Sequence, residues 1–126
     1  MKLQPDPIAN ANIITGYTGS TVQVGAQPWS ESLLLPWQGD VRPWGAARFA
    51  ELGPAHFETI AALEPELVLF GSGNRLRFAK PEWLGLLMNQ RIGLETMDTA
   101  AACRTFNLLA AEGRRVVAAL LIEAAR

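Results

Sequence analysis

Short β-rich segments, separated by residues typical of turns, occupy the first third of the chain and predict strands. Gly19-Ser20 separates two β-rich segments, so this pair is predicted to form a hairpin. Pro36 and Pro43 cannot donate to a strand ladder, and they therefore predict strand ends or edges. The strands predicted in this region cover residues 13–17, 21–24, 30–37 and 41–44.

The period changes after Gly53, where helix-like and strand-like segments begin to alternate. Pro54 suits the first turn of a helix, and Pro65 ends that helix. A continuous apolar run at 66–70 is typical of a strand buried on both faces, and 92–97 is predicted to be a second short buried strand. The helices predicted here cover residues 54–63, 81–90 and 99–112.

The helix predicted at 99–112 has the clearest local signals. Asp98 and Thr99 are good N-cap residues, because a short side-chain oxygen accepts from the free amides of a first turn. Gly113 suits the left-handed position that ends a helix. The helix carries one apolar stripe at helical spacing, which we expect to face the core. The stripe comprises Ala102, Cys103, Phe106, Leu109 and Ala110.

The apolar run at 116–122 has two interpretations. Its Ala and Leu residues are helix formers, which is compatible with an extension of the preceding helix. Val116-Val117 is β-branched and Gly113 interrupts the helix, so we favour a strand. Hairpins followed by strand–helix units predict an α/β fold, with a mixed sheet of at least five strands, an antiparallel part and about three helices.

Composition narrows the class of protein. A chain of 126 residues is the length of one domain, predicted to cover 13–126 after a loose, proline-containing arm at 1–12. A net charge of -1 gives no electrostatic footprint for nucleic acid, and one cysteine excludes an internal disulfide. The apolar runs are too short to span a bilayer and the N-terminus shows no signal peptide, so a cytoplasmic location is predicted.

A series of motifs in the second half of the chain carries a family resemblance. The motifs are Phe70-Gly71-Ser72-Gly73, Arg75-Leu76-Arg77-Phe78, IGLETMDT at 92–99, CRTFNLL at 103–109 and Glu112-Gly113-Arg114. In this order and spacing the chain resembles the uncharacterised Mth-type domain family, which includes the mitochondrial complex I assembly factor 3 and an adipogenesis-associated relative. The resemblance covers nearly the whole chain and implies a three-layer α/β fold with a central mixed sheet. It implies no established enzymatic activity, and an assembly role only by analogy.

The glycine-rich loop at 71–74 follows an apolar strand, where α/β proteins often place ligands. Its amides, with Arg75 or Arg77 nearby, suit an anion. The loop lacks the third glycine of a dinucleotide fingerprint and the Gly-Lys-Ser/Thr of a P-loop, so we favour the competing interpretation of a tight turn. The candidate ligand-binding residues are Gly71, Ser72, Gly73, Asn74, Arg75, Asp98, Thr99 and Asn107. Asn107 has a second interpretation, in which its hydrogen bonds fix the helix.

Candidate catalytic groups are few. Asp98 is in place for a base, but we favour capping, because a negative charge at a helix N-terminus is stabilising by about 0.3–1 kcal/mol. Cys103 as a nucleophile requires a histidine, and His56, the chain's only one, lies at the start of another helix. We therefore favour a buried core cysteine and predict no catalytic residue. One Cys and one His give no metal-ligand set, and no cofactor is expected.

Three of the four tryptophans follow proline, in Pro28-Trp29, Pro36-Trp37 and Pro43-Trp44. Rigid aromatic residues near strand ends suit a protein interface, and ordinary core packing is the alternative. Trp37 and Trp44, expected at the rim of a hairpin, are the predicted interface residues.

Three functions fit these observations. The first, which we favour, is a non-catalytic protein-binding or assembly-factor-like module, with a protein partner of unknown identity or a second copy of the chain. The second is a small-molecule-binding protein or enzyme whose pocket, suited to an anion, is formed by residues 71–77 and the helix start at 98–107. The third is a scaffolding domain without a ligand. The sequence contains no convincing nucleophile–base pair, which favours the first.

Overall fold

The structure, a computed structural model, describes residues 10–123. Most of the arm predicted at 1–12 therefore lies outside the described residues.

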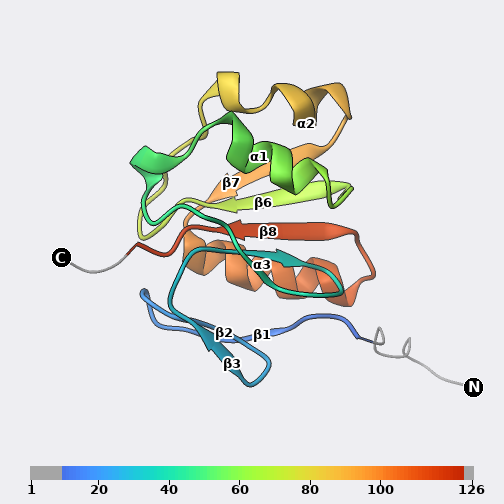
Figure 1. The fold of residues 1–126 in the computed structure, drawn as a ribbon. Helices are drawn as coiled ribbons and strands as arrows, with labels where there is room; N and C mark the ends of the chain where they lie inside the picture. The colour runs from blue at the N-terminus through green and yellow to red at the C-terminus, as the bar shows by residue number, and fades with distance from the viewer. Residues whose placement is uncertain (1–9, 124–126) are drawn as a thin grey trace, which may run out of the picture.

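A mixed five-stranded sheet forms the centre of the molecule, as predicted (Figure 1). β8 lies within the apolar run at 116–122, so the strand interpretation of that run is confirmed. It pairs in parallel with β6 and antiparallel with β4. β7 extends the parallel side and β5 the antiparallel side. In spatial order the strands are β5 (Arg42–Pro43), β4 (Leu33–Pro36), β8 (Val116–Leu120), β6 (Leu67–Gly71) and β7 (Gly93–Met97).

A second, antiparallel sheet contains β1 (Ile14–Tyr17), β2 (Val22–Val24) and β3 (Gln27–Trp29). The predicted hairpin of β1 and β2 is confirmed. The strand predicted at 30–37 is wrong in its extent, because only 33–36 are extended and paired as β4. Gly25, with φ of +59°, turns the chain so that 27–29 return along β2 and form β3, which the sequence pattern did not indicate.

Two of the three predicted helices are continuous. The described helical elements are η1 (Phe49–Glu51), α1 (Pro54–Ala61), η2 (Pro81–Trp83), α2 (Gly85–Asn89) and α3 (Thr99–Ala111). The single helix predicted at 81–90 is wrong, because Leu84 leaves helical geometry with φ of -104° and ψ of 5°. A short 3-10 turn therefore precedes α2 instead of continuing into it.

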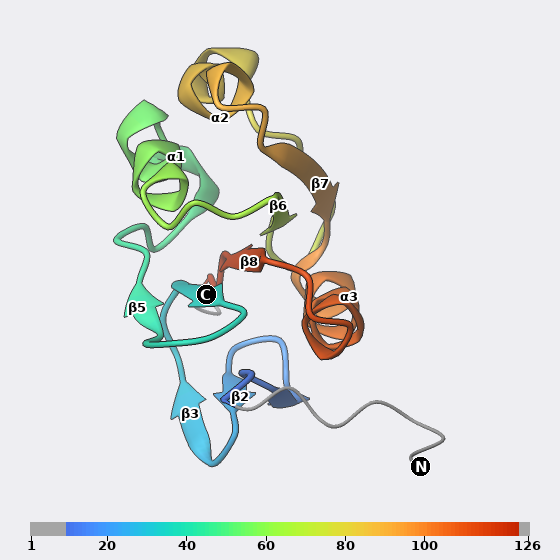
Figure 2. The same ribbon diagram turned by 90° about the vertical axis from the view of Figure 1, so that its right-hand side faces the viewer.

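The elements form three layers, and the two faces of β8 show why (Figure 2). Val116, Ala118 and Leu120 pack into the core shared with α3 and the small sheet. The alternate residues of β8 pack into the core shared with α1 and α2. All five residues of β8 are buried, since each face of a central strand is covered.

β7 corrects the prediction of a buried strand at 92–97. It is an edge strand, paired only with β6 among the described residues. Glu95 is exposed, while Leu94 and Thr96 are half-buried. The apolar character of the segment indicated burial, but the helices cover its faces only in part.

Candidate functional site

The glycine-rich loop and the α3 cap meet at one end of the central sheet. Parallel β6 and β7 end side by side, so the loop after β6 and the cap after β7 are neighbours. Ser72 N donates to Met97 O at 2.9 Å, and Thr99 N donates to Gly73 O at 2.9 Å. The structure therefore brings together the predicted ligand residues of 71–74 and 98–99.

The buried hydroxyl groups of Ser72 and Thr99 form hydrogen bonds with the backbone of this loop and its neighbours. Thr99 Oγ1 accepts from Gly73 N at 2.9 Å and donates to Leu121 O at 2.9 Å. Ser72 Oγ donates to Arg75 O at 2.7 Å and accepts from Arg77 N at 2.9 Å. The amides of Ser72 and Gly73 are thus bound by Met97 O and Thr99 Oγ1. The loop is a turn fastened to the start of α3 and, through Thr99, to Leu121 just after β8, as the competing interpretation proposed.

Arg77, which suited an anion in the sequence, is held in place by protein groups. Its guanidinium donates to Ser72 O at 2.7 Å and to Glu123 Oε1 at 2.6 Å, and it lies over the Phe49 ring at 4.7 Å from the centroid. Glu123 Oε2 also accepts from Phe49 N at 2.8 Å. Burial alone would raise the pKa of Glu123, but the bonds from Arg77 and Phe49 lower that pKa below its ordinary value. Arg75 is exposed.

A pocket of about 320 Å³ lies between this end of the sheet and the β1–β2 turn. Its lining includes the predicted residues Gly73, Asn74 and Asp98. It also includes Tyr17, whose hydroxyl donates to Asn74 Oδ1 at 2.9 Å. Burial first, and then the nearby Cys103 and Asp98, raise the pKa of Tyr17. Tyr17 was not predicted as a site residue, because no local pattern in the sequence shows that the small sheet packs beside α3.

Asp98 caps α3. Its Oδ1 accepts from Ala101 N at 2.8 Å, and its backbone is extended as an N-cap requires. The predicted capping role is confirmed, and the same side chain borders the pocket beside Tyr17.

Asn107 lies two turns further along α3 and does not line that pocket. Its carboxamide binds both backbone groups of Ile14 in β1. A second pocket, of about 280 Å³, runs between β1 and α3, and Tyr17 and Ala100 border both pockets. The second pocket is lined by Ile14, Thr15, Gly16, Tyr17, Ala100, Cys103, Arg104 and Asn107.

Cys103 is 4% exposed and lies in the core, as the apolar stripe predicted. Burial raises the pKa of its thiol to about 11, although Arg104 opposes the shift. His56 lies across the central sheet, in ring contact with Trp44 at 6.3 Å, so the structure does not bring the two groups together.

The two predicted interface tryptophans differ. Trp44 is 4% exposed, so the expectation of an exposed ring is wrong for it. Its Nε1 donates to His56 O at 3.0 Å, and its ring meets Phe57 and Phe70 edge-on. β5 ends at Pro43, and the ring of Trp44, the next residue, packs against α1. Trp37 is half-buried and contacts both core clusters.

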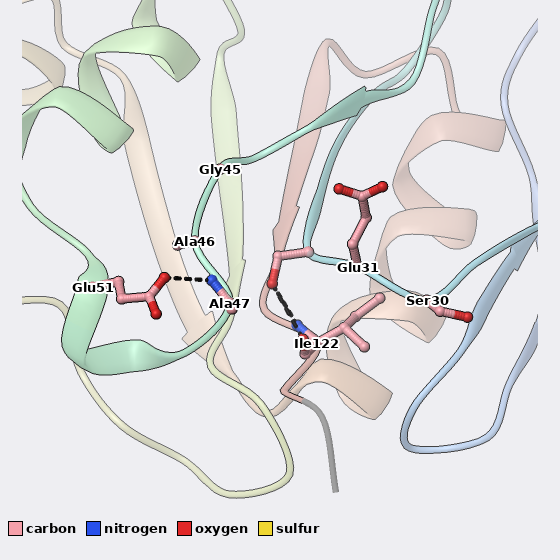
Figure 3. Close-up of a pocket in the computed structure, with 8 residues that line it drawn as sticks. Ser30, Glu31, Gly45, Ala46, Ala47, Glu51 and Ile122 are labelled. Atoms are coloured by element: carbon pink, nitrogen blue, oxygen red, sulfur yellow. Dashed lines mark hydrogen bonds between the residues drawn. The ribbon is translucent and has the colours of Figure 1, made fainter.

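A third pocket, of about 330 Å³, lies where the end of β8 passes the segment before η1 (Figure 3). Ile122 N donates to Ser32 Oγ at 2.9 Å, and Glu51 Oε1 accepts from Ala47 N at 2.8 Å. The first bond joins the chain after β8 to the segment before β4, and the second closes the turn before η1. The Glu31 side chain lies on the pocket wall.

Residues 10–123 were also compared with what a metal site and a membrane-spanning helix require of a protein. No group of three or more His, Cys, Asp or Glu side chains is placed there to hold a metal ion. None of the helices in this range combines the length and apolar character needed to cross a membrane.

Fold and site together define a three-layer α/β domain of the Mth938-like type. The chain belongs to the family described as protein of unknown function (DUF498/DUF598), matched over residues 14–121. A crystal structure from Bordetella parapertussis is 36% identical with a TM-score of 0.86, covering 93% of this chain and all of that one. An NMR structure of a Mth938-like domain from Bordetella pertussis is 32% identical with a TM-score of 0.83, covering 98% of this chain and 94% of that one.

Among curated proteins, the chain is similar to NADH dehydrogenase [ubiquinone] 1 alpha subcomplex assembly factor 3 of Bos taurus. The two are 33% identical over 99 residues, which is 77% of this chain and 53% of the relative. This chain therefore spans about half the length of the curated relative. The similarity confirms the resemblance drawn from the sequence motifs.

Proposed function

We propose that this chain is a protein-binding module with an assembly-factor-like role. The observation that carries the proposal is the 33% identity to complex I assembly factor 3 over 77% of the chain. The functional groups near the candidate site agree with a non-catalytic role. Ser72, Thr99 and Arg77 are bound within the fold, and Cys103 carries a buried thiol of raised pKa.

The proposed contacts lie on the surface rather than in a reactive centre. Trp37 stays a candidate interface residue, because its ring is half-buried and leaves area for a partner. A cytoplasmic location, a protein partner and a homo-oligomeric state likewise stay predictions.

Affinity purification tests this proposal. The full chain, tagged and expressed in its native cells, is cross-linked in place and its partners are identified by quantitative mass spectrometry. We expect one protein or complex to be enriched over a tag-only control, with cross-links to described residues. Trp37→Ala is expected to weaken that recovery, and Trp44→Phe is its matched control. A chain that recovers no protein above the control would overturn the proposal.

A second candidate is a small-molecule site in the pocket that Tyr17, Asn74 and Asp98 border. The convergence of these polar side chains favours it. Asp98 makes this pocket better suited to an amine or a hydroxyl donor than to an anion. An NMR titration with inorganic phosphate and with ethanolamine distinguishes an anion site from an amine site. Shifts at Tyr17 and Asn74 with the amine support this site, and shifts with phosphate alone support the anion interpretation.

A further inference from the structure

The two sheets have four outer edges, and three of them are blocked. β5 is two residues long and contains Pro43, and β3 is three residues long and contains Pro28. Proline has no amide to donate, so neither strand is a template for another strand. The edge of β1 is occupied by α3, since Asn107 binds both the N–H and the C=O of Ile14.

The fourth edge, β7, has none of these protections. Gly93 N donates to Glu66 O at 3.1 Å and Met97 O accepts from Ser72 N, so alternate residues of β7 face β6. Leu94 and Thr96 consequently direct their N–H and C=O groups away from β6. No strand pairs with β7 on that side within residues 10–123, and Figure 2 shows β7 at the margin of the sheet.

The sequence of β7 also leaves this edge open. Gly93-Leu94-Glu95-Thr96-Met97 contains no proline, no lysine and no bulge against β6. Proline, lysine and bulges are among the features by which natural edge strands avoid pairing, and the one charged side chain on β7 is Glu95. Five regular residues present two donors and two acceptors at the spacing of a strand. That pattern is complementary to an extended polypeptide, which satisfies every one of these groups.

We infer that β7 binds an extended segment of a partner protein as a sixth strand of the central sheet. The inference rests on the proposed protein-binding function and names the surface and the chemistry of the partner. Glu95 is exposed, and the residue opposite it in an added antiparallel strand lies about 5 Å away between Cβ atoms. A lysine or arginine at that position completes a charge pair. Its two neighbours lie beside half-buried Leu94 and Thr96 and are best apolar or β-branched.

Charge also decides between this occupant and a second copy of the chain. In a symmetrical antiparallel pair centred on β7, Glu95 faces Glu95 of the other copy. Like charges directly opposite one another destabilise a strand pair. A basic, strand-forming segment meets no such repulsion.

Peptide binding to the full chain tests the inference directly. The probes are the blocked peptides Thr-Val-Lys-Val-Thr and Thr-Val-Glu-Val-Thr, and the lysine peptide with N-methyl groups on both valines. At about 1 mM lysine peptide, we expect amide shifts and slowed hydrogen exchange at Leu94 and Thr96. The glutamate peptide is expected to bind about twofold to fivefold more weakly, and Glu95→Gln should remove this preference. N-methylation removes both amide donors and places methyl groups where the strand ladder would form, so it should reduce binding at least about fivefold.

Variants of the protein provide the second arm. Thr96→Pro removes one outward amide while leaving the bonds of Glu95 and Met97 to β6, and Thr96→Val is its matched control. Loss of lysine-peptide binding in the proline variant alone supports the inference. Shifts confined to other elements, no shifts with any peptide, or a dimer in sedimentation that Thr96→Pro abolishes would each overturn it. A partner recovered equally well by Thr96→Pro overturns the β7 edge but leaves the proposed function standing. Peptide binding at β7 with no recovered partner overturns only the proposed function.

Discussion

The carboxamide of Asn107 takes the place of a neighbouring strand for Ile14. Ile14 N donates to Asn107 Oδ1 at 2.8 Å, and Asn107 Nδ2 donates to Ile14 O at 2.7 Å. A paired strand would make the same two bonds. One polar side chain of α3 thus fastens β1, and with it the small sheet, to the helix that covers the central sheet.

Asn107→Ala is expected to destabilise the fold. The substitution leaves the N–H and C=O of buried Ile14 without their partner, which costs about 1–3 kcal/mol in the free energy of unfolding. Urea unfolding followed by circular dichroism measures it. Leu108→Ala is the matched control, because Leu108 is 61% exposed on the same helix and should change stability by less than about 0.5 kcal/mol. Equal stability of the two variants would contradict the role of Asn107.

Phe106→Ala should cost on the order of 3–5 kcal/mol. Its side chain is fully buried between α3 and the central sheet, as the apolar stripe predicted. Leu109 is only half-buried at the margin of the same core, so Leu109→Ala should cost less. Thermal and urea unfolding of both variants check the order, and a larger loss for Leu109→Ala would show that the packing is described wrongly.

Cys103 should react slowly with alkylating reagents in the native protein. Its thiol pKa is raised to about 11, so the thiolate fraction near pH 7 is about one in ten thousand. Since the folded pKa lies above the unfolded value of about 9, stability is unaffected by this group below about pH 9 and falls as pH rises toward 11. Iodoacetamide labelling in native buffer and in urea measures the difference. Faster labelling of the native form would argue for an activated cysteine.

The Arg77–Glu123 pair should make stability depend on acid pH. The pKa of Glu123 is lowered in the fold, so the ionised pair stabilises fully above about pH 4.5, and its contribution is lost as pH falls through the folded pKa. The difference in unfolding free energy between the native chain and Glu123→Gln should therefore shrink from about pH 7 to pH 3. Glu66, whose pKa is lowered chiefly by the Arg115 amide, is common to both proteins and cancels. A constant difference across this range would contradict the pair's role.

Local signals predicted much of the candidate site. The capping of α3 by Asp98 could be predicted because the cap residue, the apolar stripe and the glycine that ends the helix all lie within sixteen residues. The turn at Gly71–Gly73 followed from the same kind of reasoning. The burial of Trp44 could not be predicted in this way. A proline before a tryptophan constrains the backbone, but it does not determine which residues surround the ring. The partner of Asn107, Ile14, was not predicted either, since it lies 93 residues away.

The sequence by itself determined the elements whose causes are local: the first hairpin, the helices α1 and α3, the strands β6 and β8, and the order in which strands and helices alternate. The hydrophobic period, capping residues, proline and β-branching act over a few residues, and those residues are adjacent in the sequence. Only the tertiary structure decided that β7 lies at an edge, that Tyr17 meets Asn74, and that Arg77 is held by Glu123. Those relationships depend on which strand lies beside which. Strand order is chosen by the burial of both faces of the whole sheet at once, and no single segment contains that information.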